Sequence, residues 1–197
     1  MQFLKDEVRS TIHQCALKEF YEKGYNDASM RSIAERVGMT VGNLYRYFPN
    51  KEDLFYQVIS PAYHKLIELI QEDHTQIINL REAQSFVEYI AGRMVLINGQ
   101  HREELLILMD GCSGTRFEHA QDEIVRLVEN RLKNQLFPKL EEMNIPTPDE
   151  FFAHVLSVSI IEGMKAILKH YEDEKDMRGL ITLFIRSHFH GIGHGFI

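Results

Sequence analysis

The chain has 197 residues, of which 44% are hydrophobic and 26% charged, and this composition excludes a disordered or low-complexity protein. Its net charge of −7 is uneven: residues 1–51 hold eight Lys/Arg and six Asp/Glu, and residues 52–197 hold 14 and 23. Stretches without Asp, Glu, Lys or Arg reach only 11 residues, whereas a membrane span needs roughly 20 apolar residues. With no signal-peptide pattern and two distant cysteines, the sequence predicts a cytoplasmic protein without a membrane segment.

The first part of the chain predicts short helices separated by glycines. A first helix is expected to bury one face and to end at Gly24, because apolar residues recur every four positions at Leu4, Val8, Ile12, Ala16 and Phe20, with Cys15 beside them. Ser29 is expected to cap a second helix over Met30–Val37, which ends at Gly38.

Two further helices follow directly. Thr40 is expected to cap a third helix that runs to about Phe48, where Pro49 ends it. The segment Asn50–Asp53 has the pattern of a capped start for a fourth helix. Pro61 lies inside this helix, and we expect a kink there because proline removes a backbone donor and clashes with the preceding turn.

The rest of the chain predicts longer helices and no strands. One helix is expected to end near Gly99, a central one contains residues 105–109, another contains residues 124–136, and Thr147 is expected to cap the next. A last helix contains residues 177–185. The predicted fold is all-α, with about nine helices in total.

The segment over residues 28–54 predicts a helix-turn-helix, whose second helix enters the major groove of DNA. Burial is expected for Ile33, Ala34, Val37, Leu44 and Phe48. The outward positions are then Val41, Gly42, Asn43, Tyr45, Arg46 and Tyr47, a mixture suited to base edges and phosphates.

Lys51 supports this interpretation, because a cation at a helix N-terminus opposes the helix dipole unless a phosphate binds there. The alternative is that Tyr45 and Tyr47 are half-buried core edges and that Lys51 is an ordinary surface lysine. Taken together, the three residues favour DNA.

These residues resemble the DNA-binding domain of the TetR family of bacterial transcriptional regulators. The resemblance lies in Ser29-Met-Arg-x-Ile-Ala, in residues 37–45 (VGMTVGNLY) and in residues 47–54 (YFPNKEDL), and it covers about residues 5–60. It implies a domain over residues 1–60 and a helical ligand-binding and dimerisation domain over residues 61–197. By position it assigns DNA contacts to Arg31, Thr40, Val41, Gly42, Asn43, Tyr45, Tyr47 and Lys51, with Arg46 as a further candidate.

The resemblance also implies a homodimer, a palindromic DNA operator and a small-molecule effector. We expect the dimer to form through helices at about 147–172 and 176–190, because both carry more apolar residues than one buried stripe needs. The predicted ligand pocket comprises Arg93, Met94, Met109, Asp110, Cys112, Phe117, His119, Phe152, His154 and Met164, on helices expected to line a cavity. Each of these residues has the alternative of a core position, or of a buried ion pair for Arg93 and Asp110. The helices of residues 61–197 are expected to be interrupted at Gly99, Gly111, Gly114 and Gly163.

Other chemistry is weakly indicated. His188, His190 and His194 have a spacing that can bind a metal, but no Cys or carboxylate completes a site, so we predict no metal and no cofactor. No catalytic motif is present, which predicts that the protein is not an enzyme. The favoured function is a dimeric repressor released by a ligand. The alternatives are an all-α ligand- or metal-binding protein, and an interaction protein that acts through its dimer helices.

Overall fold

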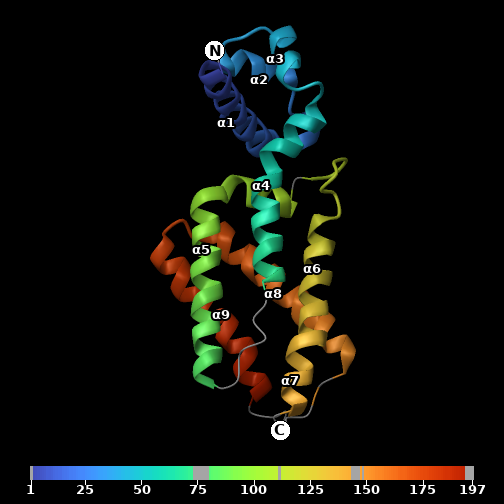
Figure 1. Cartoon of the computed structure of the whole chain (residues 1–197), viewed down its shortest axis with the longest axis vertical. Helices are drawn as coiled ribbons and strands as arrows, with labels where there is room; N and C mark the ends of the chain where they lie inside the picture. The colour runs from blue at the N-terminus through green and yellow to red at the C-terminus, as the bar shows by residue number, and fades with distance from the viewer. Residues whose placement is uncertain (1, 73–79, 111, 143–146, 148, 194–197) are drawn as a thin grey trace. The chain divides into compact units, whose positions relative to one another are not determined.

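A computed structural model describes residues 2–72, 80–110, 112–142, 147 and 149–193, and these ranges are helical with short connections (Figure 1). In chain order the elements are α1 (Gln2–Asp27), α2 (Met30–Val37), α3 (Val41–Tyr47), α4 (Lys51–Gln71), α5 (Leu80–Asp110), α6 (Ala120–Arg131), a π-helical turn η1 (Leu132–Leu136), α7 (Phe137–Glu142), α8 (Glu150–His170) and α9 (Glu174–Gly193). The all-α fold is therefore confirmed.

The helix ends near the N-terminus follow the sequence closely. The Ser29 side chain accepts a hydrogen bond from the Ser32 N–H and caps α2, and Gly38 ends α2 with φ 80°. This left-handed conformation lets the Gly38 N–H reach the last carbonyls of the helix, and a side chain would strain it. The Thr40 side chain accepts from the Asn43 N–H and caps α3. Gly24, with φ 71°, breaks α1, so the predicted end of the first helix is confirmed.

The helices α5 and α8 depart from the expectations in three places. The break inside α5 lies at His101, whose φ is −139°, and not at Gly99, which continues the helix. The cap of α8 is Asp149, whose carboxylate accepts from the Phe151 N–H at 2.8 Å, instead of Thr147. Gly163 lies within α8, so neither Gly99 nor Gly163 interrupts a helix. Gly111 lies outside the described residues. The helix α4 continues through Pro61.

The chain divides into two compact units that do not match two successive halves of the sequence. The first unit contains residues 1–64 and 101–121, and the second contains residues 65–100 and 122–197. The break at His101 coincides with one of the boundaries. The chain therefore passes between the units three times, within α4, within α5 and near the start of α6.

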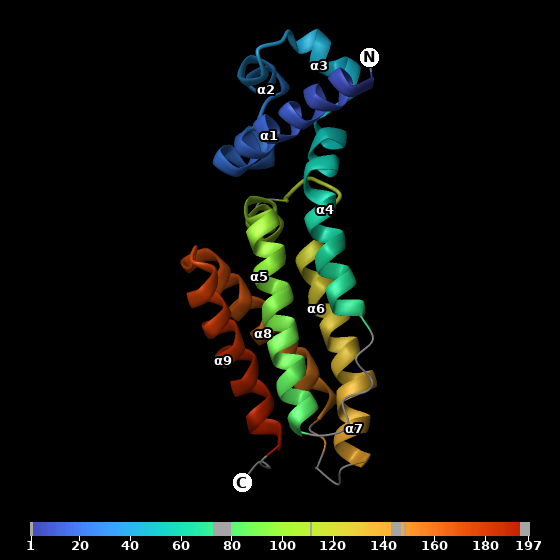
Figure 2. The same cartoon turned by 60° about the vertical axis from the view of Figure 1, so that its left-hand side comes forward.

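The second unit is held together by close packing of α8 on α9, which adjoin in both views (Figures 1 and 2). The ring of Phe184 from α9 lies over Gly163 of α8, where an added Cβ would stand 2.1 Å from the ring. One turn away, the Ser159 hydroxyl and the His188 ring make a hydrogen bond of 3.0 Å. The absence of a side chain at Gly163 thus leaves the space that the aromatic ring occupies.

The helix α8 is long and apolar enough to cross a membrane by length and composition alone, which the count of charge-free stretches did not indicate. One side of α8 packs in the core, where Ala153 and Leu156 join Leu132 and Phe137 in a buried cluster. Its other side exposes Phe151, Val155 and Val158. A single helix of this kind is weak evidence for a membrane segment, because packed core helices have the same composition.

Candidate nucleic-acid interface

The helix α3 has one anchored side and one exposed side. Leu44 and Phe48 are completely buried, together with Ile33 of α2, and they fix the orientation of α3. Val37, also predicted to be buried, is half-buried. The exposed side carries the predicted contact residues: Val41, Gly42, Asn43, Tyr45 and Arg46 are exposed, and Tyr47 is half-buried. Around the first turn of α3, an open hollow is lined by Gly38, Met39, Thr40, Gly42, Asn43 and Arg46.

The arginines of this region have different surroundings. Arg46 is exposed and makes no ion pair within the described part of the chain. Arg31 is also exposed, and its Nε lies 3.2 Å from the Glu35 carboxylate. Arg36 is instead paired with two carboxylates, with Nε 3.1 Å from buried Glu19 and a second ion pair to exposed Glu22. Arg46 therefore offers the most available positive charge on this side.

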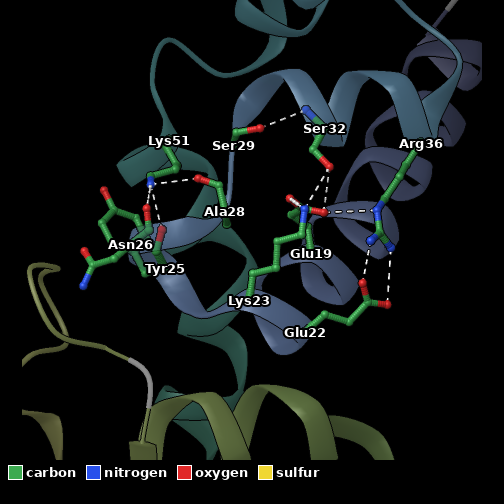
Figure 3. Close-up of polar contacts among 10 residues, drawn as sticks. All are labelled: Glu19, Glu22, Lys23, Tyr25, Asn26, Ala28, Ser29, Ser32, Arg36 and Lys51. Carbon is green, nitrogen blue, oxygen red and sulfur yellow. Dashed lines mark hydrogen bonds and ion pairs between the residues drawn. The ribbon is translucent and has the colours of Figure 1, made fainter.

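Lys51 is engaged within the domain. Its ammonium group donates to the backbone carbonyls of Tyr25, Asn26 and Ala28 at 2.7, 3.2 and 2.9 Å (Figure 3). It also lies 4.4 Å from the centre of the Tyr25 ring. An ammonium group has three donors, so Lys51 ties the segment after Gly24 to the start of α4.

Glu19 joins α1 to α2 and was not identified from the sequence. Its carboxylate is 0% exposed and accepts from Lys23 at 2.8 Å and from the Ser32 hydroxyl at 2.9 Å (Figure 3). Arg36 completes the cluster. Burial raises the pKa of Glu19, but the hydrogen bonds from Lys23 and Ser32 outweigh it, so that its pKa lies below the ordinary value. This charged cluster orients α2, and with it the turn that leads to α3.

Residues 112–117 pack against the beginning of α4. The backbone N–H of Arg116 donates to Glu52 at 3.0 Å, and its guanidinium donates to Asp53 at 2.8 Å. The same guanidinium lies 5.0 Å from the centre of the Tyr56 ring. Asp53 also pairs with Asn50 in the cap of α4. The segment therefore holds the helix that follows the helix-turn-helix.

Two residues of the predicted ligand pocket lie in this segment. Phe117 is buried, and its ring contacts those of Tyr56 and Tyr63, with centres 5.6 and 5.2 Å apart. Cys112 is buried, and burial raises the pKa of its thiol to about 12. Both residues belong to the core of the first unit, and the thiol is un-ionised at neutral pH.

The remaining members of the predicted pocket divide between the units. Met109, Asp110 and His119 belong to the first unit, and Arg93, Met94, Phe152, His154 and Met164 belong to the second. In the second unit His154 is exposed and lies 2.9 Å from Glu129. Hydrogen bonds from Lys133 and then His154 lower the pKa of Glu129. Met94 and Met164 are buried, and Phe152 is half-buried.

The histidines near the C-terminus are only partly described. Both ring nitrogens of His188 have partners, the Phe184 carbonyl at 2.8 Å and the Ser159 hydroxyl. His194 and the side chain of His190 lie outside the described residues. Within the described ranges, no three His, Cys, Asp or Glu side chains gather as metal ligands do.

The capped α2, the glycine turn and the exposed face of α3 define a helix-turn-helix domain of the kind that binds DNA. Residues 12–58 match the family model for bacterial regulatory proteins of the tetR family. Over 53 residues the chain is 45% identical to an HTH-type transcriptional regulator of Staphylococcus aureus, SAUSA300_2515. That alignment covers 27% of this chain and 29% of the relative. The chain therefore spans less than a third of the length of the curated relatives that it matches.

Solved structures share the fold over most of the chain. A TetR-family member from Streptomyces coelicolor, SCO3833, has a TM-score of 0.69 at 19% identity and covers 91% of this chain and 90% of its own. The regulator AibR, solved with isovaleryl coenzyme A and operator DNA, has a TM-score of 0.61 at 16% identity and covers 89% and 97%. The N-terminal domain of this chain is therefore of the tetR family type, and the TetR family consists of transcriptional regulators and not of enzymes.

Proposed function

We propose that this protein is a cytoplasmic repressor that binds a palindromic operator as a homodimer and is released by a small-molecule effector. One observation carries the proposal: α3 presents an exposed face that contains Asn43, Tyr45 and Arg46, while its other face is buried. A side-chain amide reads a base edge, whereas a guanidinium and a phenol hold phosphates. Arg31, Thr40, Val41, Gly42, Tyr47 and Lys51 complete the proposed contact surface.

A homodimer is supported by the exposed apolar face of α8 and α9. Phe151 is 68% exposed, Leu183 is 63% exposed, and Val155 and Val158 are exposed on the same side of α8 as Phe151. Residues 151, 155 and 158 follow the spacing of one helix face. A second copy related by a two-fold axis would cover this face and place two α3 helices on successive major grooves.

Release by an effector requires that the effector bind the two arrangements of the DNA-binding domains with different affinity. Residues 101–121 suit this role, because they belong to the first unit and continue at both ends into the second. Their contacts to α4 through Arg116 and Phe117 would carry a change in α5 or α6 to the helix-turn-helix. We also propose a domain boundary between residues 60 and 61. The effector is proposed to contact residues of the predicted pocket named above.

The test is DNA binding by the full-length protein. Retention on random DNA at low salt, followed by selection of bound sequences, is expected to yield a two-fold symmetric site with half-sites about one helical turn apart. Asn43→Ala is expected to lose about 1–3 kcal/mol at one base position and to relax the preference there. Failure to bind any DNA at low salt would favour the ligand-binding or interaction-protein alternative.

Lys51 needs a separate measurement, because the structure gives its ammonium three partners inside the domain. If Lys51 also holds a phosphate, Lys51→Ala will lower the slope of log affinity against log salt by about one contact. If Lys51 only ties the loop, Lys51→Ala will lower the stability of the domain and leave the salt slope unchanged.

A further inference from the structure

The second unit contains a buried amide whose oxygen has no hydrogen-bond partner within the described ranges. Three polar or charged side chains are buried among the described residues, namely Glu19, Asn98 and Ser157. Glu19 is fully paired, and the Ser157 hydroxyl donates to the Ala153 carbonyl at 2.7 Å. Asn98 is 3% exposed, and its Oδ1 accepts no hydrogen bond.

Asn98 lies on the interior side of α5. Ala91, Met94 and Val95, which precede it by seven, four and three residues, are all buried, so Asn98 continues their face of the helix. The neighbouring Gly99 is turned toward α9, where an added Cβ would stand 2.8 Å from the Glu174 carboxylate. Asn98 and Gly99 therefore lie on different sides of α5, and Asn98 continues the buried side that carries Ala91, Met94 and Val95.

Other polar atoms without partners are less informative. The Nε atoms of Arg93 and Arg186 and Oε2 of Glu52 also lack hydrogen bonds. All three side chains are only half-buried, and Glu52 and Arg186 make ion pairs through other atoms. A half-buried charged group can be solvated by small movements, whereas a carbonyl oxygen in an apolar interior cannot. Asn98 is thus the group whose state most needs an explanation.

We infer that Asn98 is the polar anchor of the effector site, and that the effector is a small, uncharged, largely apolar molecule with one hydroxyl or N–H donor. The donor would satisfy Oδ1, which the protein leaves open. The effector is assigned no charge because the fully buried polar side chains in the described part of the second unit, Asn98 and Ser157, are themselves uncharged. This inference rests on the proposed effector-responsive function and names the chemistry of its ligand.

The test uses two probes that differ only in the donor, indole and 1-methylindole, titrated calorimetrically into the full-length protein. Wild type is expected to bind indole about tenfold or more tightly than 1-methylindole, because the methylated probe leaves Oδ1 buried and unpaired. Asn98→Leu is expected to abolish this preference. Ser157→Ala is the matched control, since Ser157 is buried in the same unit but already paired, and it is expected to keep the preference.

Stability and DNA binding provide independent measurements. Without a probe, Asn98→Leu is expected to be at least as stable as wild type, because the change removes an unsatisfied acceptor. Equal affinity for the two probes, no binding of either, or a strong loss of stability in Asn98→Leu would overturn the inference and leave an internal water as the only partner. DNA binding by Asn98→Leu is measured in parallel: its presence with no probe preference rejects only this inference, whereas its absence in wild type rejects the proposed function.

Discussion

The two compact units differ in the pairing of their buried polar groups and in the polarity of their exposed sides. In the first unit the buried Glu19 has three partners within the domain, and the exposed side of α3 is polar and aromatic. In the second unit the buried Asn98 has an open acceptor, and the exposed side of α8 and α9 is apolar. The first unit pairs its buried charge internally, and its exposed side is polar, as the proposed DNA contact requires. In the second unit, the proposed effector would satisfy the open acceptor of Asn98, and a second copy of the chain would cover the exposed apolar side.

The largest effect is expected from a substitution on the exposed apolar side of the second unit. Leu183→Asp puts a charge into the proposed dimer contact, and burial of an unpaired charge is costly. We expect the dimer dissociation constant to rise about 100-fold or more, corresponding to about 2.7 kcal/mol. Leu96→Asp is the matched control, because Leu96 is also exposed but lies on α5. Sedimentation across a concentration series checks both variants, and equal behaviour of the two would contradict the assigned surface.

The next largest effect is expected from removing the buried charge of the first unit. Glu19→Gln keeps the shape of the side chain but removes the charge that Lys23 and Arg36 face. These partners are a third or more exposed, so the loss is discounted to about 2 kcal/mol of unfolding free energy. Urea denaturation measures it. Glu22→Gln, which changes an exposed partner of Arg36, should leave the stability almost unchanged.

Acid should remove the same stabilisation gradually. The pKa of Glu19 is lower in the folded protein than its ordinary value of 4.5. Its contribution to stability is therefore fully present above about pH 4.5 and is lost as the pH falls through the folded-state pKa. We expect the unfolding free energy of Glu19→Gln to depend less on pH below 4.5 than that of wild type. Parallel curves for the two proteins would show that other carboxylates dominate.

A smaller effect tests the packing of α8 on α9. Gly163→Ala places a methyl group 2.1 Å from the Phe184 ring, and such overpacking costs about 1–3 kcal/mol, partly offset by about 1 kcal/mol of helix propensity. Gly99→Ala meets only the end of the flexible Glu174 side chain and should be neutral or stabilising. Thermal unfolding of the pair separates them. The reverse order would show that Phe184 moves aside easily.

Local chemistry explains what the sequence predicted correctly. Ser29, Gly38 and Thr40 act on backbone groups within a few residues, so their patterns determined α2 and α3 almost to the residue. The break at His101 was not predicted, because it arises where one helix continues from one compact unit into the other. The fold of residues 61–197 could be anticipated only as a set of helices.

The site shows the same limit. Glu19 follows Ile12 and Ala16 by seven and three residues, so its position on the buried face of α1 could have been read from the spacing. Asn98 is placed likewise by Ala91 and Met94. Whether each group finds a partner depends on residues distant in the sequence, such as Ser32 and Arg36 for Glu19, and no spacing reveals that.

The smallest expected effect sharpens the comparison within the first unit, between two arginines ten positions apart. Arg46 is exposed on α3 without an ion pair in the described ranges, and Arg36 faces Glu19 and Glu22. Arg46→Ala should lower the slope of log affinity against log salt by about one, with little change in stability, because one phosphate contact releases about one counterion. Arg36→Ala should do the opposite, lowering stability while the salt slope stays that of wild type. Salt titrations of DNA binding and urea unfolding of both variants are the measurements. A salt slope reduced by Arg36→Ala and not by Arg46→Ala would mean that the Glu19 cluster opens when DNA binds, and that the exposed face of α3 is not the surface that meets the phosphates.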